Sequence, residues 1–314
     1  MSSVPELTPS KSDQDYSSNS LWRSTLRRIY RQRSAKIGGI LLILLLLIAI
    51  FAPVIAPFDP EKVLIGVEDV KKRESPCIHL LGCPEDKPQH IMGTDGNVRD
   101  VFSRVIYGSR VSLFIGFSTV GFAIIIGTVL GLLSGYFGGW SENVIMRSMD
   151  VLLAFPSLLL AIAIVSVLGP GLQNALLAIA IVSIPIYARV VRASVLSIKE
   201  QEFVSASRAL GASDSRNMFV RILPNAFPPL VVQATLGIAA AILSAAALSF
   251  LGLGAQPPTP EWGTMLGSER NQVFTAPHLV FIPGVAIMIT VLAFNLLGDG
   301  LRDALDPRLA QQGE

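Results

Sequence analysis

EFVSASRALGASDSRNMFVRILPNAFPP, residues 202–229, is a polar stretch that lies between two long apolar segments. It carries three arginines, whereas residues 171–196 before it have no charge until Arg189 and residues 230–253 after it have none. The hydrocarbon core of a bilayer is about 30 Å thick and needs roughly 20 apolar residues of helix. Both neighbours are long enough to cross a membrane, so the stretch predicts a basic element held at one membrane face between two spanning helices.

The composition is that of an integral membrane protein. Of 314 residues, 51% are hydrophobic and only 15% are charged, against about 25% charged residues in soluble domains. Residues 1–20 are polar and show no secretory signal, and the first apolar run begins near Ile37 and is too long for a removable one. We therefore expect an all-α membrane protein with a retained first helix.

Six apolar segments are long enough to be spanning helices, and they divide the chain into consecutive parts. We expect a tail with an interfacial basic amphipathic helix (1–36), a first span (37–57), a polar loop (58–110), a core (111–298) that contains the central loop (197–229), and a second tail (299–314). The core spans are expected at 111–136, 143–168, 175–195, 230–253 and 279–297. An even number of spans places both termini on the same side.

The distribution of Lys and Arg sets the expected orientation. Residues 21–36 contain six basic residues and no acidic one, and residues 189–221 contain six more, whereas the turn at 169–174 has none. By the positive-inside rule, both termini, the turn at 137–142 and the central loop are cytoplasmic. The 58–110 loop is then extracytoplasmic.

Cys77 and Cys83 are the two cysteines of the chain, and both lie in the 58–110 loop. Disulfides persist outside the cytoplasm, so the compartment favours a Cys77–Cys83 disulfide. A metal site that also uses His79 and His90 is an alternative, although the spacing matches no standard zinc pattern. Unpaired thiols are a further alternative, and we predict no metal site.

Three prolines lie inside predicted spans, where each frees a backbone carbonyl and bends its helix. They are Pro156, Pro185 and Pro283. Such bends occur as packing kinks and also in helices that line an alternating pathway. Small polar residues in the spans can likewise line a water-filled path or form interhelical hydrogen bonds. These residues are Ser166, Ser183, Gln233, Thr235, Ser244 and Asn295. Both interpretations stay open for the prolines and for the polar residues.

Motifs for catalysis are missing from these 314 residues. No Gly-x-x-x-x-Gly-Lys-Ser/Thr phosphate loop, no Gly-x-Ser-x-Gly and no His-Glu-x-x-His occurs. Asp150 is the ionisable residue nearest to the interior of a span, and a solvated or salt-bridged flank is its expected setting. We expect no catalytic site, no ATP hydrolysis by this chain alone, no bound cofactor and no nucleic-acid partner.

The central loop is predicted to fold as two short helices. Residues 202–210 form a short amphipathic helix, and Gly211 permits a turn. Ser213 or Asp214 then caps a second helix that ends before Pro224. Two short helices around a glycine make a compact knob, which suits a groove on a soluble partner.

The loop also follows a spaced pattern: a tripeptide, three residues, a glycine, and later an aliphatic residue with proline. The residues at its fixed positions are Ser205, Ala206, Ser207, Gly211, Leu223 and Pro224. The pattern resembles the EAA loop of permease subunits of binding-protein-dependent ABC importers, in the peptide/nickel branch. Serines replace the first and third residues of the Glu-Ala-Ala tripeptide here.

Three further stretches resemble the same branch: GTDGNVRDVFSR (93–104), RSMDVLLAFP (147–156) and LGDGLRDALDPR (297–308). In the first of them, Val98 stands where the family usually has glycine. The resemblance covers about residues 22–308.

The resemblance implies a type I ABC importer permease core in a bacterial cytoplasmic membrane, with coupling helices in the central loop. The residues it assigns to ATPase coupling are Glu202, Ser205, Ala206, Ser207, Leu210, Gly211, Ala212, Leu223 and Pro224. The implied partners are a second homologous permease, two cytoplasmic ATPase subunits that hold ATP and Mg, an extracytoplasmic substrate-binding protein and membrane lipid. The implied substrate is a di- or oligopeptide, with a nickel complex and glutathione still open. A stand-alone secondary transporter or channel is the alternative, and a membrane-embedded enzyme would need clustered catalytic residues that are absent.

Overall fold

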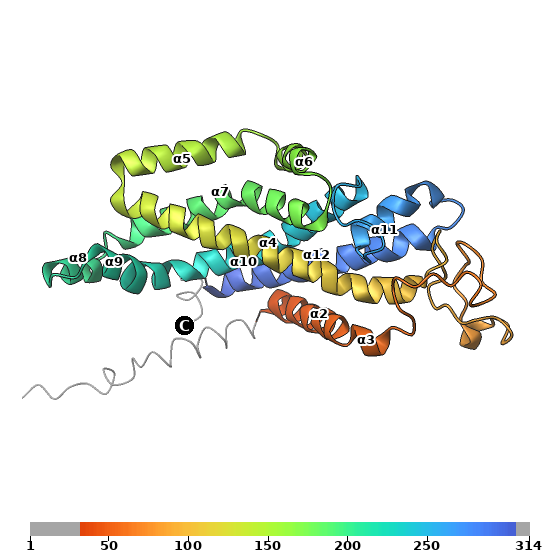
Figure 1. The fold of residues 1–314 in the computed structure, drawn as a ribbon. Coiled ribbons are helices and arrows are strands. Elements are labelled where there is room, and N and C mark those ends of the chain that lie inside the picture. The colour runs from red at the N-terminus through yellow and green to blue at the C-terminus, as the bar shows by residue number, and fades with distance from the viewer. Residues whose placement is uncertain (1–31, 306–314) are drawn as a thin grey trace, which may run out of the picture.

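The computed structural model describes residues 32–305, which are mainly α-helical (Figure 1). The helices are α2 (Arg33–Ile50), α3 (Ala52–Ile55), α4 (Val101–Phe137), α5 (Gly139–Leu153), α6 (Ser157–Leu168), α7 (Leu172–Ile198), α8 (Glu202–Ala209), α9 (Asp214–Arg216), α10 (Leu223–Phe250), α11 (Trp262–Glu269) and α12 (His278–Leu305). Of the predicted interfacial helix, residues 21–31 lie outside the described residues, as does the tail beyond residue 305.

Five helices of the described chain are long and apolar enough to cross a membrane: α2, α4, α7, α12, and α9 with α10 counted together as Asp214–Phe250. The third predicted span is instead the pair α5 and α6, which is bent by 90°. Pro156 lies at this break, directly before α6, so the interruption predicted at this proline is confirmed, and it falls between two separate helices. The proline ring and the missing N–H oppose an unbroken helix there. Pro185 and Pro283 do lie inside α7 and α12.

The central pair of the bundle is α4 and α7, and α10 packs against both (Figure 1). α12 packs on α10 and carries α2, while α5 and α6 lie on the opposite side of the bundle from α2 (Figure 1). Gly127, Gly131 and Gly135 bring α4 close to α7: a Cβ on Gly131 would lie 2.5 Å from the carbonyl oxygen of Ala188. Glycines four residues apart allow such an approach between membrane helices.

α4 begins ten residues before the predicted span 111–136, so the loop predicted over 58–110 ends at residue 100. Asp100 explains the early start, because its side chain accepts a hydrogen bond from the Ser103 N–H at 2.7 Å and caps the helix. With 37 residues, α4 is about 55 Å long. It therefore extends beyond a hydrocarbon core of about 30 Å.

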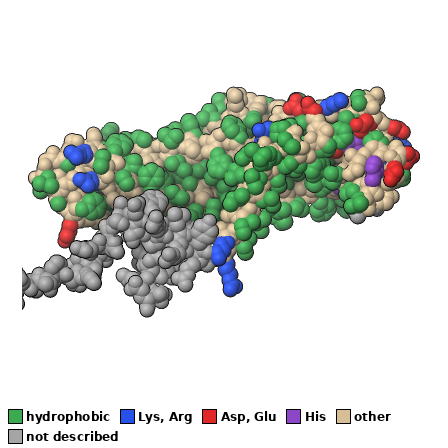
Figure 2. Space-filling model, turned by 90° about the horizontal axis from the view of Figure 1, so that it is seen from below, with side chains coloured by type: hydrophobic (Ala, Val, Ile, Leu, Met, Phe, Trp, Pro, Cys, Tyr) green, Lys and Arg blue, Asp and Glu red, His purple; other side chains and the backbone are tan. Residues whose placement is uncertain are grey.

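Side-chain chemistry is segregated along the bundle (Figure 2). Hydrophobic side chains cover the middle of the face shown in Figure 2, whereas charged side chains lie mainly toward its two ends: Asp, Glu and His, with some Lys and Arg, at the end that carries the loop before α4, and Lys and Arg, with some Asp or Glu, at the end that carries α8 and α9. Exposed apolar side chains include Ile40 and Ile43 of α2, which are 66% and 60% exposed. An apolar band between two charged ends is the surface of a chain embedded in a membrane.

Candidate functional site

The central loop forms a compact projection at one end of the bundle, between α7 and α10 (Figure 1). We call residues 202–216 the knob. α8 ends at Ala209, and two residues further on the φ of Gly211 is +80°, in the left-handed region that favours glycine. The Gly211 N–H donates to Arg208 O at 2.9 Å and the Ala212 N–H donates to Ser207 O at 3.1 Å. This pair of hydrogen bonds is a Schellman motif, which ends α8 and turns the chain toward α9.

A buried asparagine joins the two sides of the turn. Asn217 is fully buried, and its Oδ1 accepts a hydrogen bond from Ser207 Oγ at 2.8 Å. Its Nδ2 donates to Ala212 O at 3.3 Å. The second helix starts as predicted, because the side chain of Ser213 accepts from the Arg216 N–H. The knob is thus fixed internally by polar contacts, and Asn217 is the residue that sequence reasoning missed.

The outer surface of the knob exposes most of the predicted coupling residues. Leu210 is 89% exposed, and its neighbour on the knob Phe203, which was not among the predicted coupling residues, is 40% exposed. The other exposed candidates are Glu202, Ser205, Ala206, Gly211 and Pro224, while Ala212 and Leu223 are half-buried. Ser207 is buried and contacts Asn217, so it supports the knob from inside and does not belong to its outer surface.

The prediction that the second helix ends before Pro224 is wrong. α9 continues through a π-helical turn (Asn217–Ile222) directly into α10, which contains Pro224 in its first turn. In this turn the Leu223 N–H donates to Met218 O, five residues back. The wider turn accommodates a proline that would clash with the carbonyl four residues before it in an α-helix. The knob is therefore continuous with the spanning helix α10.

The candidate pathway residues have varied surroundings. Pro185 and Pro283 are buried, whereas Gln233 and Asn295 are half-buried. The hydroxyls of Ser166, Ser183 and Thr235 donate to carbonyls of their own helices. A cavity of about 110 Å³ between α6, α7 and α10 brings Ser183 and Ser244 together with Ser157. This small cavity has a mainly apolar lining into which the three serines are set, and it is next to the break at Pro156.

The two acidic residues of α5 pair with arginines of α7. Asp150 Oδ1 accepts from Arg189 at 2.6 Å, and Glu142 pairs with Arg192 across the same cleft of about 540 Å³. Asp150 is thus in the salt-bridged setting expected for it.

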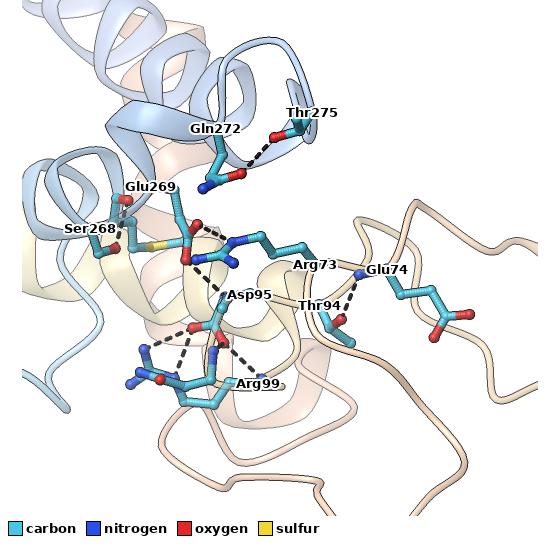
Figure 3. A network of polar contacts seen from close by, with 12 residues as sticks. Arg73, Glu74, Thr94, Asp95, Arg99, Ser268, Glu269, Gln272 and Thr275 are labelled. Carbon is cyan, nitrogen blue, oxygen red and sulfur yellow. Dashed lines mark hydrogen bonds and ion pairs between the residues drawn. The ribbon is translucent and has the colours of Figure 1, made fainter.

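The opposite end of the bundle carries the loop that precedes α4. There Cys77 and Cys83 form a disulfide with Cα atoms 5.4 Å apart. Figure 3 shows Arg73 of the loop directed at Glu269 at the end of α11, with Nε 2.8 Å from Oε2. The other carboxylate oxygen of Glu269 accepts from the Gly96 N–H at 2.9 Å. These contacts hold the loop against α11. Within residues 32–305, no group of His, Cys, Asp and Glu side chains is arranged to hold a metal ion.

Val98 occupies a position in this loop where the backbone favours glycine. Its φ is +57° and it is 1% exposed. A β-branched residue in this region is strained, and a glycine there would not be. The structure thus explains why the family pattern usually has glycine where this chain has valine.

His90 lies between two carboxylates in the same loop. It is 3% exposed, with Nδ1 2.8 Å from Asp100 and Nε2 3.2 Å from Glu68. Burial lowers the pKa of His90, but hydrogen bonds and charge attraction from Asp100 and Glu68 outweigh burial and leave that pKa above its ordinary value. Both ring nitrogens face acceptors, so the imidazolium form satisfies both contacts.

We expect the loop around His90 to loosen at alkaline pH. A folded-state pKa above the unfolded one stabilises the fold at pH values below the unfolded pKa, and the stabilisation is lost as pH rises through the folded pKa. Hydrogen exchange at the Cys77 and Gly93 amides, which both donate to His90 O, should therefore accelerate as the pH rises above the ordinary histidine pKa of about 6.5, beyond the intrinsic rise in exchange rate. The variant His90→Gln should lack this excess, and an equal excess in that variant would contradict the assignment.

Together, the bundle and its knob define an integral membrane protein with the fold of a type I ABC importer permease. The inward-facing MetNI methionine ABC transporter has the same fold, with a TM-score of 0.53 and 22% sequence identity over 65% of this chain and 97% of that chain. Residues 127–311 match the binding-protein-dependent transport system inner membrane component family, and residues 20–75 match the N-terminal TM domain of oligopeptide transport permease C. The chain belongs to the family of binding-protein-dependent transport system inner membrane components, in its peptide-permease branch.

Curated relatives cover nearly the whole chain. The dipeptide transport system permease protein DppC of Alkalihalophilus pseudofirmus is 47% identical over 98% of this chain and 96% of that protein. DppC of Haemophilus influenzae is 49% identical over 90% of this chain and 92% of that protein. The glutathione transport system permease protein GsiD of Pectobacterium atrosepticum is 45% identical over 94% of each. The family predicted from the four motifs is confirmed.

Proposed function

We propose that this chain is a permease subunit of an ATP-driven importer of di- or oligopeptides, and that the knob couples it to the ATPase subunits. The observation that carries the proposal is the knob: a compact projection, fixed internally by hydrogen bonds, with an exposed leucine, and continuous with a spanning helix. Relatives named as dipeptide and glutathione permeases support a peptide substrate, since glutathione is itself a small peptide.

The partner set follows from the proposal. A second homologous permease forms the other half of the translocation pathway, and two ATPase subunits hold ATP and Mg and bind the knob. A substrate-binding protein delivers the peptide at the opposite end. This chain itself supplies no catalytic group and no cofactor site.

The orientation also belongs to the proposal. The knob and both termini face the cytoplasm, and the disulfide-bonded loop faces the outside of the inner membrane. The exposed arginines of the central loop, Arg208, Arg216 and Arg221, support this orientation, as does the Cys77–Cys83 disulfide at the other end.

Movement of the knob is transmitted to the membrane core in this scheme. Because residues 214–250 form one helix, a displacement of the knob tilts α10. α10 lines the small cavity next to Pro156 together with α6 and α7. Tilting of α10 against the broken span at Pro156 then changes access to the pathway, as alternating access requires.

Leu210→Asp tests the knob as the site of ATPase binding. An exposed apolar anchor replaced by a charge should reduce ATPase retention on the tagged chain at least tenfold and abolish peptide uptake, while membrane insertion persists. The measurement is co-purification of the ATPase subunits together with uptake of a labelled dipeptide. Leu80→Asp is the matched control, since Leu80 is 95% exposed at the opposite end and its loss should leave ATPase retention unchanged.

Two outcomes would contradict the proposal. Undiminished ATPase retention and uptake in Leu210→Asp would remove the knob from coupling. Uptake by the chain alone, without ATP and without any partner, would favour a stand-alone secondary transporter or channel.

A further inference from the structure

One tyrosine contacts both helices of the knob from outside it. Tyr136, the penultimate residue of α4, is 8% exposed. Its hydroxyl donates a hydrogen bond of 2.6 Å to Asp214 Oδ1 at the start of α9. The guanidinium carbon of Arg208 in α8 lies 5.3 Å from the centre of its ring, within cation–π range. A single side chain thus bridges α4, α8 and α9.

This bridge is the polar link between the knob and α4. Among the described residues, no other side chain of α4 forms a hydrogen bond or a cation–π contact with residues 202–216. The knob is joined to α7 and α10 by the backbone, through residues 199–201 and 217–222. No such short backbone segment joins the knob to α4. Close by, Lys199 Nζ donates to Gly135 O at 3.0 Å and joins the ends of α4 and α7.

α4 runs from the knob end of the bundle to the opposite end, so a movement of α4 at Tyr136 also reaches the loops that contact its first turns. The helix is packed tightly on α7 along Gly127, Gly131 and Gly135, and therefore moves as a rigid element. Near its start, Arg104 donates to Pro60 O at 2.7 Å and to Pro258 O at 3.2 Å. Displacement of the Tyr136 end is thus transmitted to the loops at the opposite end.

We propose that Tyr136 is a positioning residue that transmits movement of the knob to α4, through its hydrogen bond to Asp214 and its contact with Arg208. The inference rests on the proposed coupling function of the knob. One displacement of the knob then moves two helices: α10 follows the knob through the backbone, and α4 follows it through Tyr136. Loss of Tyr136 leaves the knob attached to α7, α10 and the ATPase subunits, but removes its direct polar link to α4.

The test uses the full complex of this chain with its partner permease, both ATPase subunits and the binding protein, reconstituted in liposomes. The readout is labelled dipeptide taken up per ATP hydrolysed, measured on one preparation. Tyr136→Phe keeps the ring and loses the hydrogen bond, and Asp214→Ala loses the same bond from the other side. Each should lower the ratio roughly tenfold, the factor that one charge-assisted hydrogen bond represents. ATPase retention should stay at the wild-type level.

The double variant and a matched control make the test specific. Tyr136→Phe combined with Asp214→Ala should lower the ratio no further than either change alone, since both remove one interaction. Tyr107→Phe, the same substitution near the other end of α4, should leave the ratio unchanged. A wild-type ratio in Tyr136→Phe, or effects of the two changes that multiply, would overturn the inference.

Leu210→Asp in the same assay separates this inference from the proposed function. If Leu210→Asp retains the ATPase subunits and full uptake, the knob does not couple and both fail. If Leu210→Asp loses both while Tyr136→Phe keeps the wild-type ratio, the coupling function stands and only the role of Tyr136 fails.

Discussion

Gly131→Leu is expected to lower the thermal inactivation temperature of the detergent-solubilised protein by roughly 10 °C. A Cβ at this position would lie 2.5 Å from Ala188 O and 2.8 Å from Val191 Cβ, and both of these residues are fully buried. The backbone of α7 cannot move away without separating the two central helices. The loss of close packing removes the van der Waals contact that holds membrane helices together. Thermal unfolding followed by size-exclusion chromatography measures the shift.

Gly121→Leu is the control for this prediction, because it makes the same change on the same helix. A Cβ on Gly121 would meet nothing within 4 Å. The control should unfold within a few degrees of the wild type, apart from a small gain in helix propensity. Equal destabilisation by both substitutions would show that the effect does not come from the contact with α7.

Gly211→Pro is expected to abolish peptide uptake while leaving the chain inserted in the membrane. The φ of Gly211 is +80°, whereas proline fixes φ near −65°. Proline also removes the N–H that donates to Arg208 O in the Schellman motif. The turn between α8 and α9 then cannot form, and the contacts of Asn217 on either side of it are lost. Uptake in whole cells should fall at least tenfold, with the amount of chain in the membrane fraction unchanged.

Substitution of Gly211 by asparagine distinguishes a requirement for the left-handed turn from a requirement for a surface without a side chain at this position. Gly211→Asn places a side chain where a Cβ would meet nothing within 4 Å, and asparagine adopts the left-handed region more readily than other non-glycine residues. This variant should retain most of the uptake. Loss of uptake as severe as in Gly211→Pro would mean that the surface at residue 211 matters, and not the turn.

The general architecture was predictable because each spanning helix needs a long apolar segment, and such segments are visible in any sequence. The helix break at Pro156 was harder to predict, since an interior proline can either kink a membrane helix or end it. Whether the proline kinks the helix or ends it depends on the residues that pack around Pro156 in the fold. The early start of α4 had a visible signal in Asp100, a capping residue three positions before Ser103, within the family-like stretch at 93–104.

The site was predictable as a location and less so in its internal structure. Gly211 and Ser213 act as expected, because turn and capping preferences are local. Ser207 was assigned to ATPase coupling by its motif position, whereas in the fold it is buried and donates a hydrogen bond to Asn217 across the turn. Tyr136 carries no local signal at all, since its partners lie in segments more than seventy residues away in the chain. Contacts of this kind follow from the packing of α4 on α7, which periodicity does not reveal.

The unbroken helix from Asp214 to Phe250 determines how far a movement of the knob displaces the other end of the helix. Its 37 residues make a lever about 55 Å long. A tilt of about 10° around the midpoint moves each end by about 5 Å, close to the pitch of one helical turn. A single interrupted turn at Pro224 would have divided this lever into two short arms joined by a hinge, and most of that displacement would be absorbed there. The π-helical turn keeps the lever whole across a proline.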